Sequence, residues 1–413
     1  MLIAFTVGLV LVSVLAGLFT ALSVQSRSAA LDDLAARSGP LSVAAQDLYR
    51  SLSDADATAN SAFLAGGLEP ADVRARYESD IAQAETALAT AVAAREPADL
   101  ADPRSALAVL SRELSVYTGL VETARANNRQ GLPVGAAYQR EASSLMREQL
   151  LPAAERLYTD ETAGLRDDQD SAAAWPFVEV LLGLLALVLL FFAQRFLRRR
   201  TKRRLNTGLV VATIAAVLSL GWVLLATFGV LGNVNASREH GSTQTDVLAK
   251  ARIAALSARG DETLTLVARG SGADFEKHYQ EVSGELAGQD GLLGDARALS
   301  TDTEVRDQVA AATGQQQAWD QVHDQIRAAD DDGDYATAVS LALSTEADGA
   351  AGRFDAVDNS LREAIADTTA AFEQEVSQAS NALTGTVIGV ILLALVMAAG
   401  SVAGIWQRLK EYR

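Results

Sequence analysis

Four long apolar runs dominate the hydrophobic pattern of this chain, and polar amphipathic sequence fills the space between them. The runs lie at about residues 2–24, 176–194, 208–232 and 384–406. Each has roughly 20 residues with almost no charge, which is the length that an α-helix needs to cross a bilayer. The pattern therefore predicts four transmembrane helices. Glu179 is the one acidic residue in these runs, and we expect it at an interface because it lies in the first turn.

The first run is open to a second interpretation, a cleaved signal peptide. It lacks a charged leading region, and no small-residue cleavage pattern follows it, so we favour a membrane anchor. The chain begins on Met1 without a polar segment before the span, which leaves a start further upstream as an alternative.

The polar segment after the first run predicts four helices, because Pro and Gly interrupt it at three internal positions. The interruptions are Gly66–Pro70, Arg95–Pro103 and Asn127–Pro133. The helices expected between them cover roughly 25–65, 70–95, 103–127 and 135–174.

The second polar segment has no proline and predicts four helices again, near 235–269, 273–299, 302–329 and 335–383. The last one carries an apolar stripe at helical spacing, formed by Phe354, Val357, Leu361, Ile365, Phe372, Val376 and Leu383. No proline separates this stripe from the fourth span. We therefore expect one continuous rod, with Ala347–Gly352 as the place for a kink.

These elements predict an all-α membrane protein with four transmembrane helices and two extracytoplasmic four-helix bundles in tandem duplication. An antiparallel bundle places its first and last helix ends on one side, where both continue into spans. Asp56–Tyr77 and Asp261–Tyr279 share D-x-T, a glycine pair and D-x₄-Y, which favours a duplication. The expected boundaries are spans at 1–24, 175–194, 208–233 and 384–406, bundles at 25–174 and 234–383, a basic loop at 195–207 and a tail at 407–413.

Charge gives the orientation. Seven basic residues lie within Arg195–Arg204, and short basic loops face the cytoplasm. The predicted bundles are acidic, with 14 basic against 23 acidic side chains in 25–174 and 11 against 27 in 234–383. We therefore expect a multi-pass protein of the plasma membrane with both termini in the cytoplasm and both bundles outside.

The sequence offers no chemistry typical of an enzyme. It has no cysteine, and its three histidines stand apart, so we expect no metal and no cofactor, and His240, His278 and His323 at surfaces or interfaces. The DDDGD stretch at Asp330–Asp334 fails the calcium-loop spacing, because Ala328 and Val339 fall on ligand positions. It is better explained as a turn with a helix cap. The basic loop is too short for a nucleic-acid module, so no nucleic acid is expected.

Two corresponding stretches late in the first helix of each bundle are candidates for contact with a ligand or partner. Their charged residues are Asp54, Asp56, Arg259, Asp261, Glu262 and Arg269. An arginine there suits a carboxylate ligand. The alternative is helix capping and ion pairs within each bundle. The basic loop is a second candidate, a cytoplasmic docking surface formed by Arg198, Arg199, Arg200, Lys202, Arg203 and Arg204.

Tyr49–Gly67 and Ala258–Gly272 resemble the GlnX family of four-span actinobacterial membrane proteins, and the second also resembles chemoreceptor sensor bundles. The high Arg content, 31 against 4 Lys, also favours an actinobacterial origin. The resemblance implies amino-acid sensing: an extracytoplasmic solute-binding lipoprotein detects aspartate or glutamate, and the membrane protein relays its state to a cytosolic Ser/Thr kinase, protein kinase G. One departure is the lack of a cytosolic segment before the first span.

The residues themselves favour a signal transmitter, because the predicted cytoplasmic surface is too small for an output domain. Two alternatives stay open: a direct small-molecule receptor with a pocket inside a bundle, and an envelope scaffold that does not switch. Gly and Ala in the fourth span favour helix association, which is compatible with a homo-oligomer in the lipid bilayer.

Overall fold

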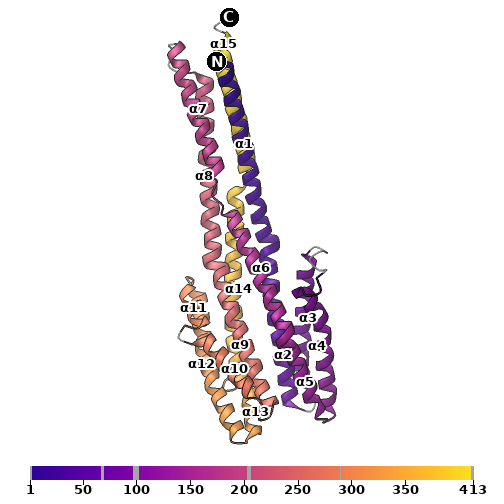
Figure 1. The fold of residues 1–413 in the computed structure, drawn as a ribbon. Helices are drawn as coiled ribbons and strands as arrows, with labels where there is room; N and C mark the ends of the chain where they lie inside the picture. The colour runs from indigo at the N-terminus through magenta and orange to yellow at the C-terminus, as the bar shows by residue number, and fades with distance from the viewer. Residues whose placement is uncertain (1, 67–68, 96–101, 202–205, 289, 411–413) are drawn as a thin grey trace. The chain divides into compact units, whose positions relative to one another are not determined.

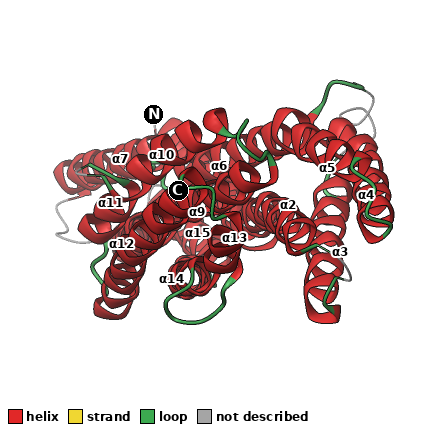
Figure 2. Cartoon of the chain, turned by 90° about the horizontal axis from the view of Figure 1, so that it is seen from below, coloured by secondary structure: helices red, strands yellow, loops and turns green. Residues whose placement is uncertain are grey.

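The computed structural model describes residues 2–66, 69–95, 102–201, 206–288 and 290–410. These residues form α-helices and three short π-helical turns, and no strand occurs among them (Figure 2). Four helical stretches in the described part are long and apolar enough to cross a membrane. The all-α class and the four candidate spans are therefore confirmed.

The chain divides into two compact units. The first, which we call the apolar unit, combines Met1–Ala36, Arg166–Ser237 and Glu373–Arg413. The second, which we call the bundle unit, combines Arg37–Leu165 and Arg238–Phe372. Each unit thus takes segments from both halves of the sequence.

The apolar unit contains the four candidate spans, α1 (Leu2–Asp33), α7 (Phe177–Thr201), α8 (Thr207–Ala236) and α15 (Thr386–Lys410). Helices α7 and α15 each pack against both α1 and α8. All four expose large apolar side chains, including Leu11, Phe177, Leu225 and Ile388. Such exposure is unfavourable in water and is what a lipid-facing surface requires.

Glycine allows α8 and α15 to approach closely. A Cβ on Gly208 would lie 2.5 Å from Gly400 O and 2.5 Å from Gly404 N. Asn206 fixes the same crossing, because its side chain caps α8 through Gly208 N and donates to Gly404 O at 2.6 Å. The small residues of the fourth span therefore pack within the chain, and the homo-oligomer stays a prediction.

The first bundle, residues 37–165, comprises α2 (Gly39–Ala65), α3 (Ala71–Ala93), α4 (Ala106–Arg129), α5 (Val134–Leu145) and most of α6 (Leu151–Ala172) (Figure 1). A π-helical turn, η2 (Met146–Leu150), joins α5 to α6, so the two form one rod. The buried core of the first bundle includes Leu48, Leu110, Tyr117 and Met146. The predicted helices 70–95, 103–127 and 135–174 agree with these bounds to within a few residues, and the predicted helix 25–65 corresponds to α2 together with η1 and the end of α1.

The second bundle, residues 238–372, comprises α9 (Thr243–Val267), α10 (Ala273–Ala287), α11 (Leu292–Leu299), α12 (Thr303–Asp331), α13 (Tyr335–Leu343) and most of α14 (Ala350–Leu383). Its core centres on Trp319, whose ring packs edge-on against Tyr279 and Phe354 at 6.0 and 5.5 Å. Asp334 caps α13 by accepting from Thr337 N, so the predicted turn and cap at DDDGD is confirmed.

Three predictions of unbroken helix in the second half are wrong. The predicted helix 273–299 ends at Gly288 and restarts after Gly291. The predicted helix 335–383 is interrupted between Leu343 and Ala350, a full break that overlaps the kink expected at Ala347–Gly352; a Cβ on Gly352 would lie 2.2 Å from Glu346 O there. The expected rod into the fourth span breaks at Gly385, whose φ of 76° is unfavourable for residues with a Cβ.

The two halves enter the bundle unit in the same way. Turn η1 (Leu34–Ser38) joins α1 to α2, and turn η3 (Ser237–Ser242) joins α8 to α9, without a break in the helix. The division between the units falls inside both turns. The helices that leave the bundle unit are interrupted before the next candidate span. Ala173–Pro176 separates α6 from α7, and Thr384–Gly385 separates α14 from α15. The similar order agrees with a duplication, which stays a prediction.

Candidate functional site

Helices α2 and α9 pack against each other and are central to the bundle unit. Residues Ser51–Asn60 are buried without exception, and so are Asp261–Val267. A helix at a protein surface buries only one stripe, so burial on all sides means neighbours on all sides. Polar residues in these stretches must therefore find partners inside the protein.

The first buried cluster surrounds Asp56. Its Oδ1 accepts from Tyr117 Oη at 3.2 Å and from Ser143 Oγ at 3.0 Å, and its Oδ2 accepts from Asn60 Nδ2 at 3.0 Å. Gln139 Nε2 donates to Asn60 Oδ1 at 2.7 Å. Burial raises the pKa of Asp56 despite these donors. The cluster joins α2, α4 and α5 through hydrogen bonds alone.

The second cluster surrounds Glu262. Its carboxylate binds Arg259, and Oε1 accepts from Trp319 Nε1 at 3.0 Å and lies 3.1 Å from His323 Nδ1. His323 Nε2 lies 3.1 Å from Glu276 Oε2. Burial disfavours the charged ring, but the hydrogen bonds to both glutamates raise the pKa of His323 to about 9.

His323 is therefore a buried imidazolium between two carboxylates, stacked on the Tyr279 ring at 3.6 Å. The expectation that every histidine lies at a surface or interface is wrong for this one. The reason is local: a protonated histidine is stable in a core when carboxylates bind both ring nitrogens.

Asp261 lies between the two bundles. His278 Nδ1 is 2.5 Å from its Oδ2, and Arg147 Nη1 of the first bundle is 3.8 Å from its Oδ1. Arg147 also stacks on the Phe275 ring at 4.5 Å, and its Nε donates to Ser143 O at 3.3 Å. Burial raises the pKa of Asp261, and His278 opposes this rise.

A third charged cluster crosses the interface of α2, α3, α9 and α14. Arg50 binds Asp54 at 3.2 Å, Arg252 binds Asp358, and Arg76 of the first bundle binds Asp355 of the second at 3.4 Å. The remaining member is Asp80 of α3, which interacts electrostatically with Asp54 and Arg76.

Among the residues that the structure describes, no hydrogen-bond partner reaches the buried Oδ2 of Asp80. Burial and the like charge of Asp54 raise the pKa of Asp80 to about 7. The other three carboxylates of the cluster each form an ion pair with an arginine, whereas no ion pair is formed by Asp80 among the described residues. Such a group is sensitive to pH near neutrality.

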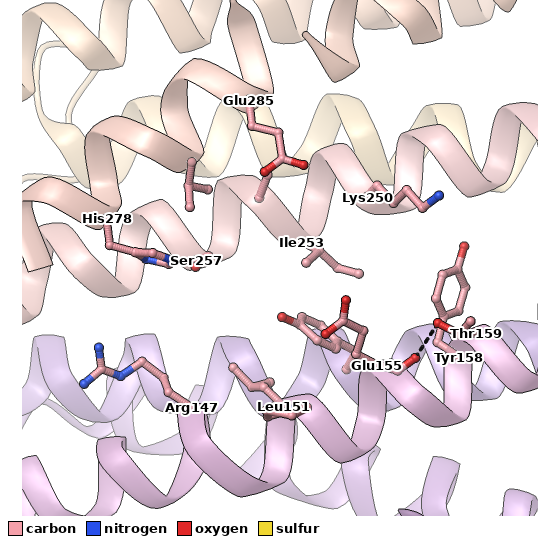
Figure 3. A pocket seen from close by; sticks show the side chains of 14 residues that line it. Arg147, Leu151, Glu155, Tyr158, Thr159, Lys250, Ile253, Ser257, His278 and Glu285 are labelled. Atoms are coloured by element: carbon pink, nitrogen blue, oxygen red, sulfur yellow. Dashed lines mark hydrogen bonds between the residues drawn. The ribbon is translucent and has the colours of Figure 1, made fainter.

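An open cavity of about 590 Å³ lies between the two bundles. Its walls come from α2, α6, α9 and α10 together with η2, and Figure 3 shows them. Arg147 and His278 stand at one end, Lys250 and Tyr158 at the other, and Glu155 and Glu285 extend toward the space from opposite sides. The volume suits a small organic molecule.

The structure distributes the six predicted ligand or partner residues over separate sites of the bundle unit. Asp54, Asp56, Arg259, Asp261 and Glu262 are all buried and bind side chains within the bundle unit. Arg269 is exposed, has a φ of 43° and stacks over the Tyr335 ring at 4.8 Å. The ion pair of Arg259 and Glu262 corresponds to the alternative of pairs within the bundle. Contact with a partner stays a prediction for the set.

Sequence reasoning missed Arg147, which joins the bundles, and the polar partners of Asp56. Tyr117, Gln139 and Ser143 occupy core positions of amphipathic helices. A polar residue on the apolar face of a predicted helix could have indicated these buried hydrogen bonds. Arg147 carried no comparable signal, because its role depends on the packing of two bundles.

The cytoplasmic candidates fall largely outside the described residues. Arg198 ends the described side chains of α7 and is exposed. The side chains of Arg199 and Arg200, and the whole of Lys202, Arg203 and Arg204, lie outside that part of the structure. Docking on the basic loop stays a prediction. Among the residues that are described, no group of His, Asp and Glu is arranged to hold a metal ion.

Residues 30–170 match a family model described as Actinobacterial sensor domain. The match supports an actinobacterial sensor protein. The matched segment includes all of α2–α5 and nearly all of α6, and with them the Asp56 cluster. No curated protein and no solved structure matches the chain.

Proposed function

We propose that this protein is a non-enzymatic transmembrane signal transmitter, in which the bundle unit receives a signal outside the cell and the helices α1 and α8 carry it inward. One observation carries the proposal. The helices α2 and α9, which continue α1 and α8 without a break, pack together and hold the buried polar clusters. The sensor-domain match over residues 30–170 supports the same role.

The physical basis is a choice between discrete packings. Packed helix interfaces shift in steps, because close-packed side chains cannot deform continuously. A signal that favours one packing of α2 against α9 changes the populations of both packings. The polar contacts between the bundles, such as Arg147 with Asp261, would be remade in such a step.

The identity of the signal and of the partners belongs to this proposal as well. The resemblance to the GlnX family supports an amino-acid signal, delivered by an extracytoplasmic solute-binding lipoprotein and passed to a cytosolic Ser/Thr kinase. The concentration of positive charge at Arg195–Arg204 supports a cytoplasmic turn and, with it, both termini in the cytoplasm. The kinase would dock on that turn.

The test is crosslinking in cells, followed by purification of the full chain and mass spectrometry. The wild type is compared with a variant in which Arg198, Arg199, Arg200, Arg203 and Arg204 are changed to Gln, once its topology is verified. Recovery of a lipoprotein and a kinase with the wild type, and loss of the kinase alone in the variant, is the expected result. Recovery of neither would reject the relay and leave a receptor or a scaffold.

A direct small-molecule receptor is the second candidate, and the cavity between the bundles favours it. The two functions are compatible, because a ligand in the cavity contacts α6, α9 and α10 and would bias the same packing. A scaffold would require neither the cavity nor the buried charge clusters.

A further inference from the structure

We infer that the cavity between the bundles binds an elongated amphoteric molecule, with a carboxylate at Arg147 and His278 and an ammonium group at Glu155 and Glu285; a short peptide with free termini has this chemistry. The inference rests on the sensing role proposed above and names a ligand class for it. Its basis is the order of charges along the cavity (Figure 3).

The cationic end, formed by Arg147 and His278, is preorganised by contacts within the protein. The Phe275 ring holds the Arg147 guanidinium from one side, and Ser143 O accepts from its Nε. Behind it, Asp261 is buried and forms its short contact with His278, at 2.5 Å, rather than with Arg147, at 3.8 Å. The guanidinium thus keeps donors for an incoming carboxylate, which it binds in a charge-assisted manner.

The acidic part of the cavity, which we call the acidic end of the ligand site, lies between Arg147 and His278 on one side and Lys250 and Tyr158 on the other. Glu155 and Glu285 line opposite walls, both are exposed, and neither has an ion-pair partner among the described residues. Lys250 does not neutralise them, because it binds Asp246 at 3.1 Å. The Tyr49 hydroxyl stays protonated, since burial and the nearby Glu155 charge raise the pKa of Tyr49. The excess negative charge favours a cationic group.

The spacing decides the length of the ligand. Arg147 and Glu155 are eight positions apart on the rod of η2 and α6, which corresponds to about 12 Å at the α-helical rise. His278 and Glu285 are seven positions apart on α10, or about 10 Å. An extended chain of three residues spans about 10 Å. The volume of about 590 Å³ accommodates a molecule of this size.

A ligand here would also act on the interface. Its carboxylate competes with Asp261 for Arg147, which connects the two bundles. Binding therefore replaces a contact between bundles with contacts to the ligand. This gives the ligand different affinities for two packings, which is the condition for a shift in population.

The experiment measures binding of trialanine to the full chain in lipid nanodiscs by calorimetry, at millimolar peptide. Trialanine with an amidated C-terminus and trialanine with an acetylated N-terminus remove one charge each. We expect each blocked peptide to bind about tenfold more weakly, the loss of one charge-assisted contact. Free alanine, which cannot span both ends, is also expected to bind more weakly.

Variants of the cavity residues test which residues bind each terminus of the peptide. With Arg147→Gln, the amidated and free peptides should bind equally, and with Glu155→Gln and Glu285→Gln together, the acetylated and free peptides should bind equally. Arg140→Gln and Glu148→Gln, which do not line the cavity, are matched controls. If Arg147→Gln does not fold, the variant at the exposed glutamates still tests the acidic end.

Three results would overturn the inference: no binding of trialanine, binding that is insensitive to both blocked termini, or equal binding of free alanine. The signal transmitter is tested separately, by the crosslinking experiment without added peptide. Absence of peptide binding together with recovery of both partners would reject the ligand class and retain the transmitter.

Discussion

Arg252 binds Asp358 with two hydrogen bonds, from Nε at 2.5 Å and from Nη2 at 2.9 Å, and both side chains are buried. The pair connects α9 to α14 inside the second bundle. Breaking a buried pair from one side leaves an uncompensated charge, which is more damaging than losing the attraction itself.

We therefore predict that Arg252→Met destabilises the protein by about 3–5 kcal/mol. Thermal unfolding of the full chain in detergent gives the measurement. Lys277→Gln is the control, because the pair of Lys277 with Glu281 is largely exposed and such pairs contribute about 0–1 kcal/mol. Equal melting temperatures for the two variants would contradict a buried pair.

The His323 site predicts a loss of stability in alkaline solution. The folded-state pKa of His323 is raised to about 9, above the unfolded value of about 6.5. Its stabilisation is complete below the unfolded value and is lost as pH rises toward 9, because the folded protein binds the extra proton in that window. The loss is expected to reach roughly 3 kcal/mol.

The measurement is the melting temperature between about pH 6 and 9.5 for the wild type and for His323→Gln. The variant removes this titration, so the difference between the two curves should shrink as pH rises. A difference that is independent of pH would mean that His323 is neutral in the folded protein.

Asp80 predicts a pH dependence over a lower window. Its folded-state pKa of about 7 lies above the unfolded value near 3.9, so the folded protein retains a proton that the unfolded chain releases. Stability from this group therefore falls as pH rises through that interval. Asp80→Asn should stabilise the protein by about 1–3 kcal/mol at pH 8 and have little effect near pH 4.

Asp72→Asn is the matched control for this prediction, since Asp72 is exposed on the same helix, α3. Chemical denaturation at several pH values separates the two variants. A destabilised Asp80→Asn at pH 8 would show that the charge is paired in solution.

The crossing of α8 and α15 predicts a sharp difference between two glycines of one helix. Gly208→Leu places a side chain against the backbone of Gly400 and Gly404, whereas a Cβ on Gly221 would contact nothing within 4 Å. Gly208→Leu should cost at least about 1–3 kcal/mol, and Gly221→Leu little. Melting temperatures in nanodiscs compare them, and equal values would reject the close crossing.

The absence of cysteine from the sequence makes topology directly measurable. We predict that Thr159→Cys reacts with a membrane-impermeant maleimide in intact cells, and that Thr201→Cys reacts only after permeabilisation. The reason is the basic stretch beside Thr201, which is expected to stay in the cytoplasm. The reverse pattern would place the bundles inside the cell.

The fold was largely predictable because local signals and tertiary packing agree. The stripe from Phe354 to Leu383 fixed the buried face of α14, and Phe354, Val357 and Leu361 are all buried. The breaks at Gly288 and Gly385 were missed, since a single glycine in a periodic stretch is a weak signal.

The site was predictable only in part. Asp56 and Asp261 were found because they repeat in corresponding stretches, but their burial was not foreseen, since charged residues are usually exposed. Arg147, His278 and the cavity come from different helices that meet only after both bundles pack. No periodicity or motif in the sequence predicts which residues of different helices lie close together after packing.

The turns η1 and η3 each contain one residue more than an α-helix needs for the same number of turns. One residue corresponds to about 100° of rotation around a helix axis. The surplus residue of each turn therefore offsets the buried face of the helix that follows it, α2 or α9, by this angle from the pattern of an unbroken α-helix. Both halves of the chain carry this offset at the same place in their order of helices.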